Sequence, residues 1–274
     1  MKSVLWHALT YFVAGTLGAL LGALFNVFIH RVPVCGDSVD FHRKVVGLSY
    51  FSTGEVCREG DAHFSTHYPV VECLTALLWI ALLVWQGGLT VVLPFDLLFV
   101  SAISALIFID AEHMILPNAI TYPGILLAFL ARILVPHLAG PAHFDDLPQL
   151  LTFFPGLPVW VVSLIGAAIG ALAGGGSLWL MGFLWEKLRG VEAMGFGDVK
   201  MMFMVGAFLG WRLTILTILL GAFTGSIAGV IVMLRRGSRN LQMMLPFGIF
   251  LGIGSIVSLL LGSRIIAWYA SQFR

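Results

Sequence analysis

Two aspartates lie where this sequence carries almost no other charge. Asp110 ends a run of 13 uncharged residues, and Asp198 stands at the mouth of an apolar segment, within GFGDVK, residues 195–200. An ionisable side chain in such a place is costly, so it indicates a function and a partner group. Two carboxylates a short distance apart cannot both ionise easily, so one keeps a proton while the other takes a proton from water. Aspartic proteases attack a peptide carbonyl in this way.

The glycines before Asp198 predict how a substrate would reach it. Gly195 and Gly197 allow positive φ angles, and they let a substrate strand approach the backbone closely. A helix that opens at Asp198 would stabilise the ionised carboxylate through its aligned amides. Each aspartate also has a simpler interpretation, which stays open here. Asp198 could be an N-cap, and Asp110 could extend to a membrane interface.

The composition indicates a membrane protein. The chain has 274 residues, 59% of them apolar and only 11% charged, against about 25% charged in soluble domains. Its mean hydropathy is +0.98, which predicts an all-α, polytopic helix bundle surrounded by membrane lipid. The net charge is +1 and no basic stretch interleaves with aromatics, so we expect no nucleic-acid partner.

Apolar runs predict about eight transmembrane or half-membrane segments, which must position the two aspartates. Their residues are 4–29, 70–86, 96–110, 119–136, 159–185, 199–211, 213–234 and 244–262. The segment after Asp198 is too short to cross about 30 Å of hydrocarbon, so we expect a half-buried helix. Gly166, Gly170 and Gly174 recur every fourth residue, which predicts close helix packing.

Basic residues predict the orientation of the bundle. With the amino terminus outside, the inner loops hold 10 of the 15 lysines and arginines, whereas the outer loop 137–158 holds none. The positive-inside rule favours this arrangement. The ten are Arg31, Arg43, Lys44, Arg58, Lys187, Arg189, Lys200, Arg235, Arg236 and Arg239. Asp110 and Asp198 would then both lie at cytoplasmic helix ends.

Several segments, in order, resemble one family. FIDAEHMILPN (108–118) and EAMGFGDVKMMFMVGAFLGW (192–211) resemble the two active-site segments of the bacterial type IV prepilin peptidases, membrane aspartyl proteases of the GxGD class. GALLGALFNVFIHRVP (18–33) resembles the family's amino-terminal helix, and FSTHYPVVECLTALLW (64–79) resembles the stretch that enters its second helix. LPFGIFLGIGS (245–255) resembles the family's last helix. The resemblance makes Asp110 and Asp198 the catalytic pair. It places Gly195, Gly197 and Lys200 in the second motif, with Glu192 just before it.

The resemblance also implies a substrate and a location. Members cleave, on the cytoplasmic face of the bacterial inner membrane, the leader of type IV prepilins or of type II secretion pseudopilins. The bond that is cut follows a glycine, just before the substrate's apolar helix. Many members then methylate the new amino terminus with S-adenosylmethionine. Hydrolysis itself would need no cofactor.

The first loop departs from the family pattern. We divide the chain into a first helix (1–30), a cytoplasmic loop domain (31–69) and a membrane peptidase core (70–274). Well-known members carry two CxxC pairs in the loop, a zinc signature, but this loop has only Cys35 and Cys57. We favour reduced thiols over a zinc site completed by one of His42, His63 and His67.

Two other classes of function compete with a peptidase. A proton-coupled transporter also places carboxylates at membrane depth, but it predicts inverted repeats and a polar site near the midplane. We find no convincing repeat, and both aspartates lie at helix ends. A catalytically inactive scaffold of a pilus or secretion assembly is the second alternative.

Overall fold

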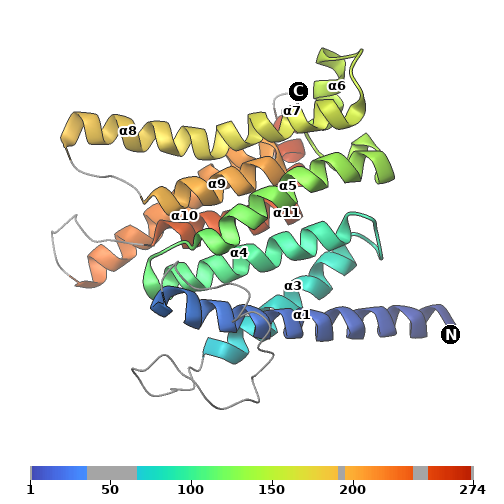
Figure 1. Cartoon of the computed structure of the whole chain (residues 1–274), viewed down its shortest axis with the longest axis horizontal. Coiled ribbons are helices and arrows are strands. Elements are labelled where there is room, and N and C mark those ends of the chain that lie inside the picture. The colour runs from blue at the N-terminus through green and yellow to red at the C-terminus, as the bar shows by residue number, and fades with distance from the viewer. Residues whose placement is uncertain (1, 36–66, 191–194, 237–245, 273–274) are drawn as a thin grey trace.

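The structure, a computed structural model, describes residues 2–35, 67–190, 195–236 and 246–272. For residues 2–8, 26–35, 67–68 and 236 it describes the backbone alone. Most of the described residues are helical, and none of them forms a β-strand, as the composition predicts. Figure 1 shows the long helices running roughly side by side along one direction.

The helices follow the predicted order of apolar segments. They are α1 (Lys2–Cys35), α3 (His67–Trp85), α4 (Leu93–His113), α5 (Asn118–Ala139), η1 (Pro141–His143), α6 (Leu147–Phe153), α7 (Val159–Ala171), η2 (Leu172–Gly176), α8 (Ser177–Arg189), α9 (Phe196–Leu209), α10 (Trp211–Arg236) and α11 (Phe247–Ser271). The π-helical turn η2 joins α7 and α8 into one run, so each of the eight predicted segments corresponds to one stretch of helix.

Five of the described helical runs are long and apolar enough to cross a membrane. They are Leu93–His113, Asn118–Ala139, Val159–Arg189, Trp211–Arg235 and Phe247–Ser271. The described parts of α1 and α3 add two shorter apolar helices. The chain is therefore a multi-pass membrane protein.

Helix α9 is short and enclosed, and it carries Asp198. Its 14 residues extend about 21 Å at 1.5 Å per residue, less than the hydrocarbon core needs. It packs against α5, α7, η2 and α10, and Figure 1 shows it among the other helices of the bundle. Most of its residues are buried. The predicted half-buried helix is therefore confirmed.

Glycines bring α9 close to the α7–η2 run. A β-carbon on Gly170 or on Gly206 would overlap the carbonyl group of the other, and one on Gly174 would overlap the Met202 carbonyl oxygen. Gly166 instead packs against the side chains of Asp146 and Leu150. The predicted close packing of the glycine series is therefore confirmed, and it fixes the position of α9 and of Asp198.

Prolines and left-handed residues set the helix ends near the aspartates. Pro117 and Pro246 are the extended residues that precede α5 and α11. Met114, with φ 54°, ends α4 and donates its N–H to the Asp110 carbonyl oxygen. Gly210, with φ 82°, ends α9. Because residues in these conformations do not continue a helix, α4 ends within one turn of Asp110, at His113, and the chain turns again after α9.

Candidate active site

Asp110 lies in the last turn of α4 and faces the bundle. Its residue surface is 5% exposed, and its Oδ2 accepts the backbone N–H of Ile249, in the first turn of α11, at 3.1 Å. A side chain held in this way does not extend outward. The interpretation of Asp110 as an interface carboxylate is therefore wrong.

Asp198 is the third residue of α9 and is 9% exposed. The N-cap of α9 is Gly195, and no side chain caps the helix. The interpretation of Asp198 as an N-cap is therefore wrong. The side chain nonetheless belongs to the first turn, where the free amides of the helix favour negative charge.

Gly248 shows that the two carboxylates share one small space. A β-carbon on Gly248 would lie 2.7 Å from Asp110 Oδ2 and 3.1 Å from Asp198 Oδ1. The two oxygens are therefore no farther apart than the sum of these distances. The ends of three helices, α4, α9 and α11, bring the pair together, although Asp110 and Asp198 lie far apart in the sequence.

No described cation neutralises this pair of carboxylates. The ion pairs among the described residues leave out both Asp110 and Asp198. Lys200, which the second motif places two residues later, donates to Asn118 Oδ1 at 2.7 Å and lies 5.3 Å from the Tyr122 ring. It therefore ties α9 to α5. Carboxylates this close without a cation cannot both ionise easily, so they can hold one proton between them.

The glycines of the second motif behave differently from the prediction. Gly195 has φ −66°, and Gly197 lies within α9, so the expected positive φ angles are wrong. A β-carbon on Gly197 would lie 2.9 Å from Leu116 Cβ, whereas one on Gly195 would meet nothing within 4 Å. Gly197 therefore lets α9 approach the chain after α4, and Gly195 faces open space. Glu192 lies outside the described residues.

Sequence reasoning missed the contribution of α11. Gly248 and Ile249 contact the aspartates directly. From the sequence, their segment, LPFGIFLGIGS, was assigned only a resemblance to the family's last helix. The glycine directly after a proline and an aromatic residue was the available signal. It indicates a close backbone approach just inside a helix start.

The predicted reduced thiols and the alternative zinc site concern mainly residues of the first loop. Cys57, His42 and His63, and the side chains of Cys35 and His67, lie outside the described residues. Cys73 lies in α3 and is exposed. In the part of the chain that the structure describes, no group of three or more histidine, cysteine or acidic residues could hold a metal ion.

Comparisons with known proteins agree with the resemblance. A model of the type IV leader peptidase family matches residues 97–230, and a model of the bacterial peptidase A24 N-terminal domain matches residues 16–86. The chain is 30% identical to the prepilin leader peptidase/N-methyltransferase of Pseudomonas aeruginosa, over 92% of this chain and 91% of that protein. The chain belongs to the type IV leader peptidase family. The family is one of peptidases, and its matched range includes both Asp110 and Asp198.

Two further relatives match a similar share of this chain. The prepilin leader peptidase/N-methyltransferase of Stutzerimonas stutzeri is 31% identical, over 90% of this chain and 78% of that protein. The protein of the same name from Aeromonas hydrophila is 32% identical, over 91% and 78%. No solved structure matches the chain significantly. The similarity therefore extends over most of the sequence, although the predicted boundaries at residues 30 and 69 stay predictions.

Proposed function

We propose that this chain cleaves the leader peptides of prepilins and that Asp110 and Asp198 are its catalytic pair. The observation that carries the proposal is the shared space beside Gly248, where one oxygen of each carboxylate lies about 3 Å from the same point. Relatives named prepilin leader peptidase/N-methyltransferase support the choice of substrate. Pseudopilins of type II secretion systems belong to the same proposed substrate class.

In this mechanism the two carboxylates divide the proton transfers of hydrolysis. One carboxylate removes a proton from a water molecule, and the other donates a proton to the carbonyl oxygen of the scissile bond. Their roles exchange when the amine leaves. The Ile249 N–H holds one oxygen of Asp110 in place, so the pair is oriented before the substrate binds. Hydrolysis by this route needs no cofactor.

The open space beside Gly195 is where we place the substrate backbone. No heavy atom lies within 4 Å of a β-carbon built there, and the neighbouring Phe196 side chain is exposed. A glycine at the cut site would fit beside this backbone, with the apolar helix of the substrate against the bundle. The distribution of basic residues favours the cytoplasmic side of a bacterial inner membrane.

Methyl transfer is a second proposed activity, and it rests on the names of the relatives. S-adenosylmethionine would supply the methyl group to the new amino terminus. None of the described residues is assigned to that donor, and no step of the hydrolysis depends on it.

The two alternative functions make different predictions. A transporter needs a polar site near the midplane of the membrane, whereas Asp110 and Asp198 lie in the last turn of α4 and the first turn of α9. Membership of a peptidase family also argues against transport. The inactive scaffold is distinguished by the direct assay.

Mass spectrometry of the amino terminus of a co-expressed prepilin is the deciding experiment. We expect leader removal with the wild-type chain and with Glu186→Gln, an exposed control in α8, but not with Asp110→Asn or Asp198→Asn at equal accumulation. An added methyl mass on the processed terminus would establish the second activity. Leader removal at the wild-type rate by either aspartate variant would contradict the catalytic pair.

A further inference from the structure

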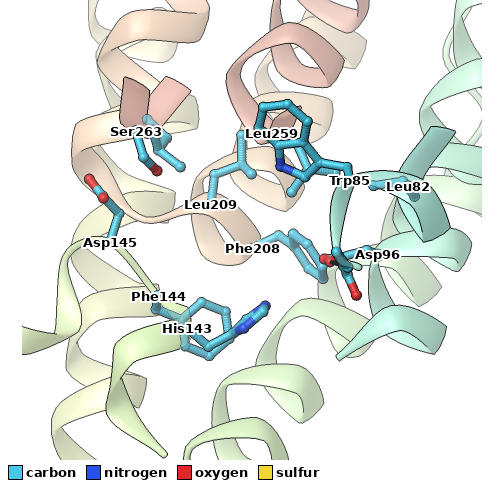
Figure 2. A pocket seen from close by; sticks show the side chains of 12 residues that line it. Leu82, Trp85, Asp96, His143, Phe144, Asp145, Phe208, Leu209, Leu259 and Ser263 are labelled. Carbon is cyan, nitrogen blue, oxygen red and sulfur yellow. Dashed lines mark hydrogen bonds between the residues drawn. The ribbon is translucent and has the colours of Figure 1, made fainter. Parts of the chain in front are cut away.

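A cavity of about 190 Å³ lies at the end of the bundle opposite the aspartate pair. It opens among the end of α3, the first turn of α4, the loop before α6, the α9–α10 turn and the second half of α11. Figure 2 shows Trp85, Asp96, His143 and Phe144 around this space. Asp96 and Asp110 belong to opposite ends of α4, about 21 Å apart at 1.5 Å per residue. The cavity is therefore separate from the proposed active site.

Asp96 is the carboxyl group of this cavity that has no described cation beside it. It is 5% exposed, and one of its oxygens accepts a hydrogen bond from the Gln86 amide. The ion pairs of the described residues do not include it. The second lining carboxylate, Asp145, lies 3.4 Å from an Arg212 nitrogen. Burial lowers the pKa of His143, so this imidazole adds no positive charge at neutral pH. The cavity therefore has an uncompensated acceptor for a cationic ligand.

The rim supplies the opposite charge next to an apolar surface. The Arg264 guanidinium lies 3.9 Å from the centre of the Trp85 ring, and Trp85 lines the cavity. The helices α10 and α11, which contribute lining residues to the cavity, carry exposed apolar side chains, among them Ile215, Leu219 and Leu261. Only 11% of the apolar window of α10 is buried within the chain. A ligand here can therefore combine an ammonium group, an anionic group and apolar chains.

We propose that this cavity binds the headgroup of a phospholipid that carries a primary ammonium, with Asp96 accepting from the ammonium and Arg264 facing the phosphate. A primary ammonium donates hydrogen bonds to a carboxylate, which a quaternary ammonium cannot do. The Arg264 contact occupies a face of Trp85 that a quaternary ammonium would use. The acyl chains would lie along α10 and α11. This proposal does not depend on the peptidase mechanism.

Native mass spectrometry of the purified full-length protein tests the proposal. The protein is exchanged in turn into phosphatidylethanolamine, phosphatidylcholine and phosphatidylglycerol, and the lipid retained after activation is counted. We expect phosphatidylethanolamine to be retained about tenfold more than phosphatidylcholine, the difference that one charged hydrogen bond supports. Equal retention of these two lipids would overturn the proposed recognition of the ammonium.

Two variants and a soluble amine complete the test. Asp96→Asn should lose the preference for phosphatidylethanolamine, whereas Glu186→Gln on the exposed face of α8 should keep it. Ser263→Trp, which fills the cavity from its exposed rim, should lower retention and keeps the proposal testable if Asp96→Asn does not fold. Wild-type retention by Ser263→Trp and by folded Asp96→Asn would overturn the site. Displacement of the lipid by millimolar ethanolamine would show a site for free amines and would overturn the lipid assignment.

Discussion

The two ends of α9 place buried carboxylates in opposite electrostatic situations. Near its amino-terminal end, Asp198 and Asp110 face each other with a backbone N–H as the described donor to the pair. Near its carboxyl-terminal end, Asp146 lies 2.8 Å from Arg132 Nη1, and both residues are fully buried. A carboxylate with a cation stays ionised and holds elements together, whereas two carboxylates without one remain available for proton transfer.

The carboxyl-terminal end of α9, near the Arg132–Asp146 ion pair, has further contacts with the bundle. Arg132, in α5, also donates its Nε–H to the Ala207 carbonyl oxygen at 3.1 Å and lies 4.1 Å from the centre of the Phe144 ring. One guanidinium thereby joins α5, α9 and the loop before α6. This end is a structural anchor for α9.

The same Asp→Asn substitution can be made near each end of α9, and the largest expected effect is at Asp198. Asp198→Asn should lower the rate of leader cleavage by on the order of 10²–10⁴, because it removes one acid–base group. It should leave the unfolding temperature in detergent at or above the wild-type value, since it removes a buried ionisable group that no described cation compensates. Cleavage rate and thermal unfolding are measured on the same preparation. A large loss of stability in this variant would break the comparison.

Asp146→Asn should have the opposite consequence. It leaves the buried Arg132 charge unpaired, which costs about 3–5 kcal/mol of unfolding free energy. Cleavage per folded molecule should change little. Chemical denaturation followed by near-ultraviolet circular dichroism measures the loss. The double variant Arg132→Met, Asp146→Leu should recover most of it, because no charge is then left buried. An unchanged midpoint for Asp146→Asn would show that the pair does not anchor α9.

Gly248→Ala should affect turnover more than substrate binding. Its added methyl group would press on Asp110 Oδ2, 2.7 Å away, and a displacement of about 1 Å costs up to roughly 10² in rate. We expect kcat to fall and KM to stay near the wild-type value. Gly225→Ala in α10, where the nearest atom is 3.4 Å away, is the control. Wild-type kcat for Gly248→Ala would show that the carboxylates do not react in the observed positions.

The smallest effects should distinguish the two glycines of the GFGDVK segment. Gly195→Ala should raise KM for a prepilin without lowering the unfolding temperature, because its surroundings are open. Gly197→Ala should lower the unfolding temperature, because its β-carbon would lie 2.9 Å from Leu116 Cβ. Steady-state kinetics and thermal scans separate the two outcomes. An unchanged KM for Gly195→Ala would contradict the proposed position of the substrate backbone beside Gly195.

Much of the fold could be predicted because the bilayer limits the choices. Apolar runs gave the eight helical segments, and the short segment after Asp198 predicted an enclosed half-membrane helix. The detailed geometry of the second motif was predicted less well. The N-cap interpretation of Asp198 and the positive φ of Gly195 and Gly197 are wrong, because α9 begins earlier, at Phe196, with Gly195 as its N-cap. Local sequence rules leave a helix start uncertain by a few residues.

Other features could not be predicted from sequence patterns. Arg132 lies in an apolar helix with nothing nearby in sequence to name its partner, and Asp146 becomes that partner through the loop that follows α5. Gly248 reaches the aspartates only because α11 returns to α4. Such contacts depend on the packing of distant elements, which local patterns do not encode.

The sequence by itself determined the membrane class, the order of the helices and the aspartates that belong to the family's segments. Those properties follow from the cost of burying polar groups in lipid and from residue identity along the chain. Only the tertiary structure decided which buried carboxylate lies beside a cation and which two carboxylates lie beside each other. Compensation of a buried charge depends on distances of a few ångströms between helices. The packing of α4, α9 and α11 fixes those distances at Asp110 and Asp198.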